Sequence, residues 1–142
     1  MEQSLKRLTI LKSHIRPKKT AAVEGKVHYE FKEELRAAII TWDFPATLNA
    51  LSPETIIPLA EHLMRIEKDD KIGVVILTGV GSTFSAGANI SNFGDGSDFT
   101  GGVKFEDLKD KEWYRPIISF SKPIIAAVNG YCLGGGMEVA LM

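Results

Sequence analysis

A glycine-rich segment near the end of the chain carries the residue types that could stabilise a developing negative charge. The apolar run Ile124 to Val128 has the length of a buried strand, and it is followed by Gly134 to Gly136 and then by helix-forming residues. Bare backbone N–H groups at such a helix start, together with the helix dipole, suit an anion or an oxyanion. Glu138 follows in the first helical turn between apolar neighbours, where a carboxyl group can have a raised pKa and act as acid or base.

The same residues also have a purely structural interpretation. Glycines in a turn between a strand and a helix allow the two elements to approach closely. Glu138 would then be an ordinary acidic residue of the first helical turn, where the helix dipole favours a negative charge. On this segment alone, both interpretations are open.

Two further motifs favour the chemical interpretation. The segment VVILTGVGSTFSAGANI, which begins at Val74, lies about 45 residues before KPIIAAVNGYCLGGGMEVAL, and TLNALS occupies Thr47 to Ser52. These three motifs, in this order, resemble the enoyl-CoA hydratase/isomerase (crotonase) superfamily, and the resemblance runs from about Val27 to Met142. It implies an α/β fold, a crotonase-like ββα spiral.

The resemblance also implies a site for thioester chemistry. In this superfamily two backbone N–H groups stabilise the enolate oxygen of an acyl-CoA, and they map onto Ala88 and Gly135. Glu138 matches one of the two catalytic glutamates of the hydratases, and the second belongs to a segment beyond Met142. Six further residues are expected to line the substrate site: Ala46, Ala86, Gly87, Asn89, Ile90 and Gly134. No separate cofactor is implied, because coenzyme A is part of the substrate.

The expected function is hydration of a 2-enoyl-CoA thioester in fatty-acid β-oxidation or a related acyl-CoA pathway. One alternative is a Δ3-Δ2 enoyl-CoA isomerase, which needs only one base, and another is a non-catalytic crotonase-like fragment. The superfamily core is roughly twice as long as this chain of 142 residues. We therefore expect residues 26–142 to be an incomplete core, either a fragment, a truncated gene product or a chain that needs a partner. The resemblance further implies a homotrimer or hexamer.

Composition excludes several other classes of function. The chain is 44% hydrophobic and 25% charged, as in an ordinary globular domain, and it is long enough for one core. Its net charge of −1 supports no nucleic-acid partner. The single cysteine, Cys132, rules out an internal disulfide, and no apolar run is long enough to predict a membrane span. The three histidines are scattered, so we expect no metal site.

The apolar pattern predicts the elements that must position these residues. Strands are expected over residues 27–31, 35–42, 73–78 and 123–128, and helices over 52–68 and about 105–120. Ser52 and Pro53 form a typical helix start, whereas Pro58 predicts a kink or a later start. We expect the last three strands in one sheet. The two that end in glycine should be adjacent and parallel, which would bring both following loops to one sheet edge.

The N-terminal segment differs from the rest of the chain in charge. Residues 1–25 carry six basic and two acidic side chains, a net charge of +4, and the remainder carries −5. Arg7-Leu8, five residues, and His14-Ile15 resemble an N-terminal peroxisomal address. A mitochondrial presequence and a disordered basic arm are the alternatives. We expect this segment to lie outside the packed domain.

This address can be tested on the segment alone. A fluorescent protein carrying residues 1–25 should give a punctate peroxisomal pattern, and His14→Asp should disperse it because the substitution removes a residue of the recognition pattern. Fluorescence microscopy with organelle markers measures both. A mitochondrial pattern that His14→Asp leaves unchanged would contradict the prediction.

Overall fold

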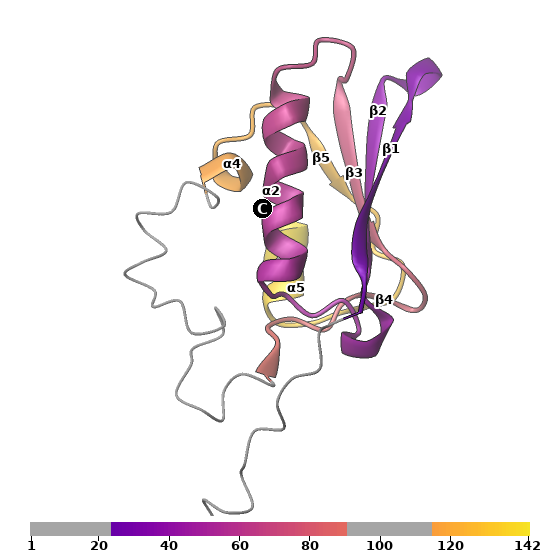
Figure 1. Ribbon diagram of the computed structural model, residues 1–142, viewed down its shortest axis with the longest axis vertical. Coiled ribbons are helices and arrows are strands. Elements are labelled where there is room, and N and C mark those ends of the chain that lie inside the picture. The colour runs from indigo at the N-terminus through magenta and orange to yellow at the C-terminus, as the bar shows by residue number, and fades with distance from the viewer. Residues whose placement is uncertain (1–23, 91–114) are drawn as a thin grey trace, which may run out of the picture.

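The computed structural model describes residues 24–90 and 115–142 of the chain (Figure 1). Its strands are β1 (Lys26–Lys32), β2 (Ala37–Asp43), β3 (Val74–Gly79), β4 (Thr83–Ser85), β5 (Ile124–Ala126) and β6 (Tyr131–Cys132). Its α-helices are α2 (Pro53–Glu67), α4 (Arg115–Ile118) and α5 (Gly135–Leu141), and its short 3₁₀ helices are η1 (Glu33–Leu35) and η2 (Pro45–Thr47). The helix predicted over 105–120 falls partly outside the described residues, and its described part ends at Ile118.

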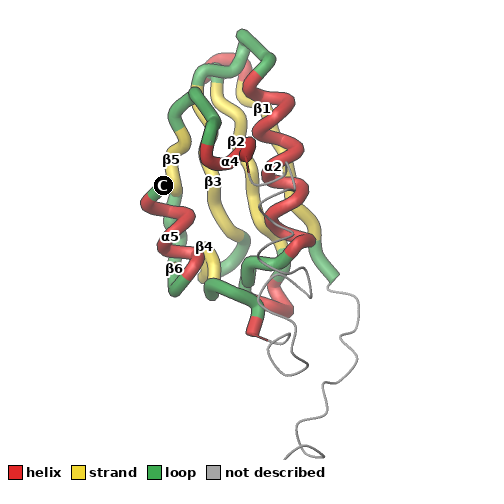
Figure 2. Tube along the Cα trace, turned by 90° about the vertical axis from the view of Figure 1, so that its left-hand side faces the viewer, coloured by secondary structure: helices red, strands yellow, loops and turns green. Residues whose placement is uncertain are grey.

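A four-stranded sheet organises the described chain, with strand order β1-β2-β3-β5. β1 pairs antiparallel with β2, while β2 pairs parallel with β3, and β3 pairs parallel with β5. The three strands predicted to share a sheet do so, and the two strands that end in glycine are neighbours, as predicted. β4 and β6 form a second, two-stranded parallel sheet just beyond the ends of β3 and β5 (Figure 2).

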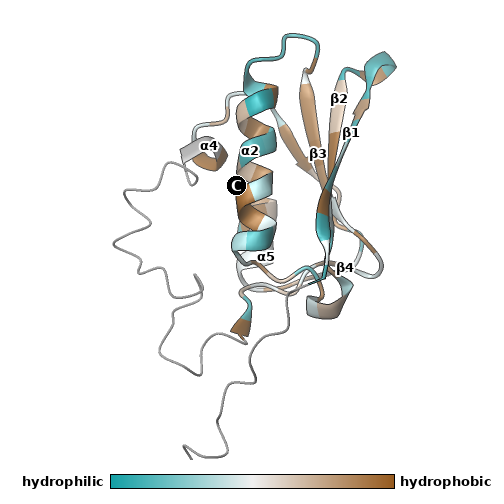
Figure 3. Ribbon diagram, viewed as in Figure 1, coloured by the Kyte–Doolittle hydropathy of each residue, from teal (hydrophilic) through white to brown (hydrophobic). Residues whose placement is uncertain are grey.

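The core lies between the sheet and α2, which covers one sheet face (Figure 1). Alternate residues of β2 and β3 point toward this helix, so each strand is buried at every second position. α2 presents an apolar stripe to the sheet, and Figure 3 shows the helix alternating between brown and teal as this stripe turns. The members of the core with less than 3% exposure include Ala38, Ile40, Trp42, Leu59, Leu63, Ile66, Val75 and Phe84.

Several predicted element boundaries were wrong. β2 begins at Ala37 and not at residue 35, because η1 and the left-handed Arg36 (φ 49°) turn the chain first. By contrast, α2 begins at Pro53, as Ser52 and Pro53 predicted, and it continues through Pro58, so the alternative of a later start is incorrect. Its first turn is fixed by Thr55, whose Oγ1 accepts a hydrogen bond from the Ser52 N–H at 2.9 Å. α5 begins among the glycines, at Gly135.

β5 departs most from the sequence-based expectation. The run 123–128 was predicted to be a strand buried on both faces, but the strand spans Ile124–Ala126, and Ile124 and Ile125 are 41% and 54% exposed. The reason is that, among the described elements, β5 contacts mainly β3 and the short α5, so little covers its two faces. The apolar residues of this run are therefore exposed in the described part of the chain and do not belong to its core.

Lys122 joins the start of β5 to the end of α2. Its Nζ donates hydrogen bonds to the carbonyl oxygens of Ile66 at 2.7 Å, Asp69 at 2.7 Å and Ile72 at 3.0 Å, which uses all three ammonium protons. These oxygens belong to the helix end and the following turn, where intrahelical donors have run out. Beside it, the Ser121 Oγ and N–H donate to the Glu67 carboxylate, and these hydrogen bonds lower the Glu67 pKa.

We expect Lys122→Met to destabilise the fold by about 2–3 kcal/mol, because it removes three charge-assisted hydrogen bonds to carbonyl groups, of which only those of Ile66 and Asp69 keep a backbone N–H donor among the described residues. Lys71→Met is the matched control, since Lys71 is exposed in the same turn. Chemical denaturation monitored by circular dichroism measures the free energy of unfolding. Equal stability of the two variants would contradict the capping role.

Candidate functional site

The two glycine-rich segments meet at one end of the sheet, directly after β4 and β6. Gly87 and Gly134 both have positive φ angles, +90° and +47°, which side chains disfavour. A Cβ atom on Gly87 would lie 2.7 Å from the Leu133 carbonyl oxygen and 3.4 Å from the Gly135 nitrogen. A Cβ atom on Gly136 would lie 2.7 Å from the Ser85 Cβ. The glycines are therefore required for the two loops to pack backbone against backbone.

Among residues 24–90 and 115–142, three backbone N–H groups at this contact donate no hydrogen bond: those of Ala88, Gly134 and Gly135. By contrast, the Gly87 N–H donates to the Ser85 Oγ, and the Gly136 N–H donates to the Leu133 oxygen. A Cβ atom on Gly135 would lie 3.9 Å from the Ala88 nitrogen, so the two residues adjoin. Both are partly exposed, which leaves these N–H groups available to an external acceptor.

The backbone of residues 86–89 is fixed on its other side by the segment after η2. The Leu51 N–H donates to the Gly87 oxygen at 2.7 Å, and the Asn89 N–H donates to the Leu51 oxygen at 3.1 Å. These two bonds form a parallel bridge between Leu51 and Ala88. Because the neighbours of Ala88 bond toward Leu51, the Ala88 N–H faces away from that segment.

Asn49 holds this arrangement together. Its side chain is buried, and Oδ1 accepts from the Phe44 N–H at 2.9 Å while Nδ2 donates to the Thr83 oxygen at 2.7 Å. Its own carbonyl oxygen accepts from the Ser85 Oγ at 2.8 Å, and Ser85 in turn accepts from the Gly87 N–H at 3.2 Å. In the sequence Asn49 stands out only as part of the TLNALS motif, and nothing in that motif indicates this positioning role.

The residues predicted to line the substrate site differ in their exposure to solvent. Ala46, Ile90 and Gly134 are exposed, and Ala86 is partly exposed. Gly87 is buried and Asn89 is only 7% exposed, so the structure buries two of the six residues expected to line the substrate site. No sequence pattern shows this, because both residues are held beside Leu51 by backbone hydrogen bonds.

Glu138 lies in the first turn of α5, one turn after Gly135, and its N–H donates to the Gly134 oxygen at 3.2 Å. The residue is exposed. This differs from the apolar enclosure that its sequence neighbours suggested, because those neighbours point along other faces of the helix. The described residues bring Glu138 near the glycine loops without enclosing it.

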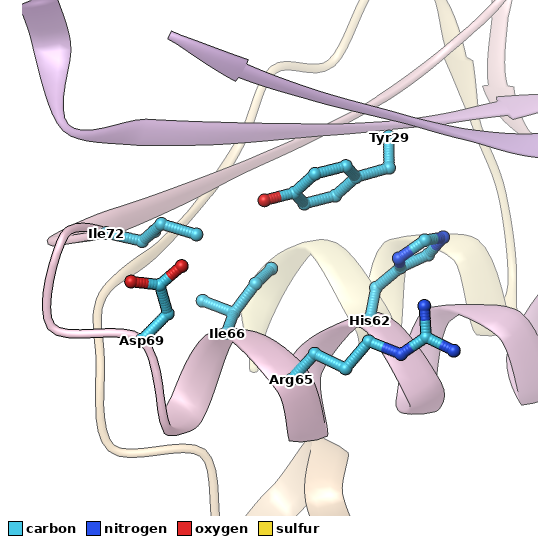
Figure 4. Close-up of a pocket in the computed structure, with 6 residues that line it drawn as sticks. All are labelled: Tyr29, His62, Arg65, Ile66, Asp69 and Ile72. Atoms are coloured by element: carbon cyan, nitrogen blue, oxygen red, sulfur yellow. The ribbon is translucent and has the colours of Figure 1, made fainter. Parts of the chain in front are cut away.

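A small pocket lies elsewhere in the molecule, between β1, α2 and the turn that follows α2 (Figure 4). Its volume is about 150 Å³, and none of the predicted site residues lines it. Tyr29 and His62 stack across it with ring centroids 5.1 Å apart. Burial lowers the pKa of His62, with a further contribution from Arg65, and burial raises the pKa of Tyr29. This pocket is separate from the residues predicted to act on an acyl-CoA.

The described part of the chain offers no group of three or more metal-ligating His, Cys, Asp or Glu side chains. Its helices are also too short or too polar to cross a membrane, as far as the described ranges extend.

Comparisons with known proteins point to one family. The family model described as Enoyl-CoA hydratase/isomerase matches residues 32–142. The short-chain-enoyl-CoA hydratase of Clostridium acetobutylicum is 40% identical over 111 residues, and the mitochondrial enoyl-CoA hydratase of Pongo abelii is 35% identical over 107 residues. The solved enoyl-CoA hydratase/isomerase of Pseudoalteromonas atlantica superposes with a TM-score of 0.63 over 80% of this chain, at 29% identity.

The chain spans less than half of these proteins. The matches cover 78% of this chain but 42% of the Clostridium hydratase, and 73% of this chain but 34% of the Pongo hydratase. The solved structure is covered over 42% of its length. More than half of each relative therefore has no counterpart in the residues matched here.

We expect Asn49→Ala to lower the free energy of unfolding by about 3–5 kcal/mol, because it leaves buried donors and acceptors unpaired and forces alanine into a positive φ of 54°. Asn129→Ala is the matched control. That amide also joins loop carbonyl and N–H groups, including the Gly81 oxygen, but it is exposed. Urea denaturation measures both, and a loss for Asn49→Ala no larger than that for the control would contradict the account.

Proposed function

The chain belongs to the enoyl-CoA hydratase/isomerase family, and on that premise we propose that it forms the oxyanion-binding part of a site that hydrates 2-enoyl-CoA thioesters. The observation that carries the proposal is the pair of adjoining N–H groups, on Ala88 and Gly135, that have no acceptor among the described residues. They come from separate segments, and both segments are hydrogen-bonded to other backbone.

The chemistry requires two such donors. When water adds to C3 of a 2-enoyl thioester, the electron pair of the C2–C3 double bond moves toward the carbonyl, and the thioester oxygen becomes the oxygen of an enolate. N–H groups already aimed at that oxygen stabilise the charge without reorganising, and removing one such donor typically costs about 10²–10³ in rate. The Gly135 N–H also lies at the start of α5, where the helix dipole favours negative charge, although α5 is short.

Glu138 is the proposed acid–base group of the described chain. In the proposed step one carboxylate takes a proton from the attacking water, and a carboxylic acid delivers a proton to C2, so that water is added overall. A second acidic residue is needed for this scheme. We propose that it belongs to the portion of the fold that the relatives carry and the matched residues do not. That portion would also enclose Glu138, which is exposed here.

The substrate-binding roles follow from the same loops. Ala86, Gly87 and Gly134 are small, which lets a thioester approach the main chain. Ala46 and Ile90 are exposed on neighbouring segments and are proposed to contact the rest of the acyl-CoA. For Asn89 the proposed contribution is its backbone, since the residue is buried. Coenzyme A is proposed to enter as part of the substrate, with no separate cofactor.

The pathway and the assembly are proposals of the same kind. Hydration of 2-enoyl-CoA thioesters fits fatty-acid oxidation, and a homotrimer or hexamer would follow the family. A peroxisomal location rests on Arg7, Leu8 and His14, which lie outside the described residues. The mitochondrial name of the Pongo relative supports the alternative organelle.

The decisive variants are Gly135→Ala and Glu138→Gln, made in a chain extended by the portion that the relatives carry. A Cβ atom on Gly135 makes one close contact, with the Leu51 Cδ1 at 3.0 Å, which is the end of a flexible side chain, so the fold should hold to within about 1 kcal/mol. The added methyl group would occupy the space in front of the Ala88 N–H, and hydration should fall by at least 10²-fold. Glu138→Gln should retain acyl-CoA binding and lose turnover.

Product analysis with 2-enoyl-CoA and 3-enoyl-CoA separates hydratase from isomerase. Hydration of the 2-enoyl thioester supports the proposal, whereas double-bond migration without hydration would replace it with the isomerase alternative. Full rates of both reactions in Glu138→Gln would show that Glu138 is only a first-turn acid. Calorimetry with the acyl-CoA gives binding independently of turnover.

A further inference from the structure

The link between β5 and β6 contains a pair of residues that can react with each other. Asn129 precedes Gly130, and both residues are exposed. Among the described residues the Gly130 N–H donates no hydrogen bond, whereas the next N–H, that of Tyr131, donates to the Ser82 oxygen at 3.0 Å. The Gly130 nitrogen therefore carries a proton that no backbone acceptor holds, and no side chain shields its approach to the neighbouring Asn129 amide.

The packing of the chain requires glycine at position 130. A Cβ atom there would lie 2.0 Å from the Ser82 carbonyl oxygen and 2.5 Å from the Ser82 carbonyl carbon. Both are backbone atoms, and the same oxygen is held by the Tyr131 N–H, so the clash has no inexpensive relief. A residue with a side chain, which would hinder an attack by its own nitrogen, is therefore excluded at this position.

The contacts of the Asn129 side chain need a donor and an acceptor in one planar group. Its Nδ2 donates to the Gly81 oxygen at 2.8 Å, and its Oδ1 accepts from the Gly79 N–H at 3.3 Å. A carboxylate could accept from Gly79 but could not donate to Gly81, and an aliphatic side chain could do neither. Two independent structural demands thus place a side-chain amide directly before a glycine.

We propose that Asn129 is a site of spontaneous deamidation. The Gly130 nitrogen loses its proton and forms a bond to the Asn129 Cγ, while the Cγ–Nδ2 bond breaks and Nδ2 leaves as ammonia. This gives a five-membered succinimide ring. Water then opens the ring at Cγ, which gives aspartate, or at the main-chain carbonyl carbon, which gives isoaspartate. Overall one water is consumed and one ammonia is released, so the reaction needs no oxidant, cofactor or second protein.

Each product weakens the contact between the loop after β3 and the segment after β5. In aspartate an oxygen replaces the Nδ2 donor, so two acceptors would face each other across the 2.8 Å that now separates the amide from the Gly81 oxygen. In isoaspartate the main chain gains one carbon atom just before β6. The Tyr131 and Leu133 N–H groups, which donate to the Ser82 and Ser85 oxygens, would then lose their register. The modification therefore loosens β6 and the glycines that follow it.

The test incubates the folded 142-residue chain in mildly alkaline buffer, and mass spectrometry of a proteolytic digest follows the replacement of NH₂ by OH at each asparagine. Asn129 should react about 10-fold faster or more than Asn49 and Asn89. These two are the matched controls within the same chain, because both are buried and each precedes a residue with a side chain. Labelling by an isoaspartyl methyltransferase should detect isoaspartate at position 129. A rate no higher than that of the controls, or aspartate without isoaspartate, would overturn the proposal.

A second measurement reports on the structural consequence. Ion exchange separates the deamidated chain by its additional negative charge, and hydrogen exchange at the Tyr131 and Leu133 amides should then be about 10-fold faster than in the intact chain. Exchange in β2 should not change. Unchanged exchange at Tyr131 and Leu133, or an equal rise in β2, would contradict a local loosening. None of these readouts involves acyl-CoA, so their outcome is independent of the proposed function.

Discussion

The arrangement of the two glycine loops depends on one buried amide. Asn49 bonds to the chain on both sides of it, to Phe44 near the end of β2 and to Thr83 at the start of β4, and its carbonyl oxygen anchors Ser85. Ser85 then holds the Gly87 N–H, so the orientation of the next peptide group is set by a chain of buried hydrogen bonds. Gly136 packs directly on Ser85, which brings the second loop to the same place. The adjoining donors on Ala88 and Gly135 are the outcome of this packing.

The opposite end of the sheet is held by a second non-local group. The Lys122 ammonium group donates hydrogen bonds to three carbonyl oxygens at the end of α2 and in the turn after it. These bonds hold the start of β5 in place beside β3. β5 is short and has one neighbour, so little else determines its position. From this start the chain runs along β3 and reaches the glycines at the other end. The loop geometry thus depends on polar contacts at both ends of the strand.

The sequence was sufficient for the parts of the fold that follow from local pattern. The apolar runs predicted β2, β3 and β5, the family resemblance predicted their shared sheet, and Ser52-Pro53 predicted the start of α2. The features that could not be predicted depend on contacts between residues that are far apart in the sequence. Asn49 and Thr83 are 34 positions apart, and no spacing rule pairs an amide with that carbonyl. The exposure of Ile125 and Glu138 likewise follows from which elements stand beside β5 and α5, and residue type does not encode this.

The central claim is that the Ala88 and Gly135 N–H groups together bind the oxygen of a thioester. Infrared difference spectroscopy of an acyl-CoA carrying a ¹³C-labelled thioester carbonyl tests it most directly, with the chain in a form extended by the portion that its relatives carry. Two hydrogen bonds to the oxygen polarise the C=O bond, so the account predicts a carbonyl stretching band at lower frequency in the bound thioester than in water. A bound thioester whose band lies at the same frequency as in water, or above it, would contradict the account.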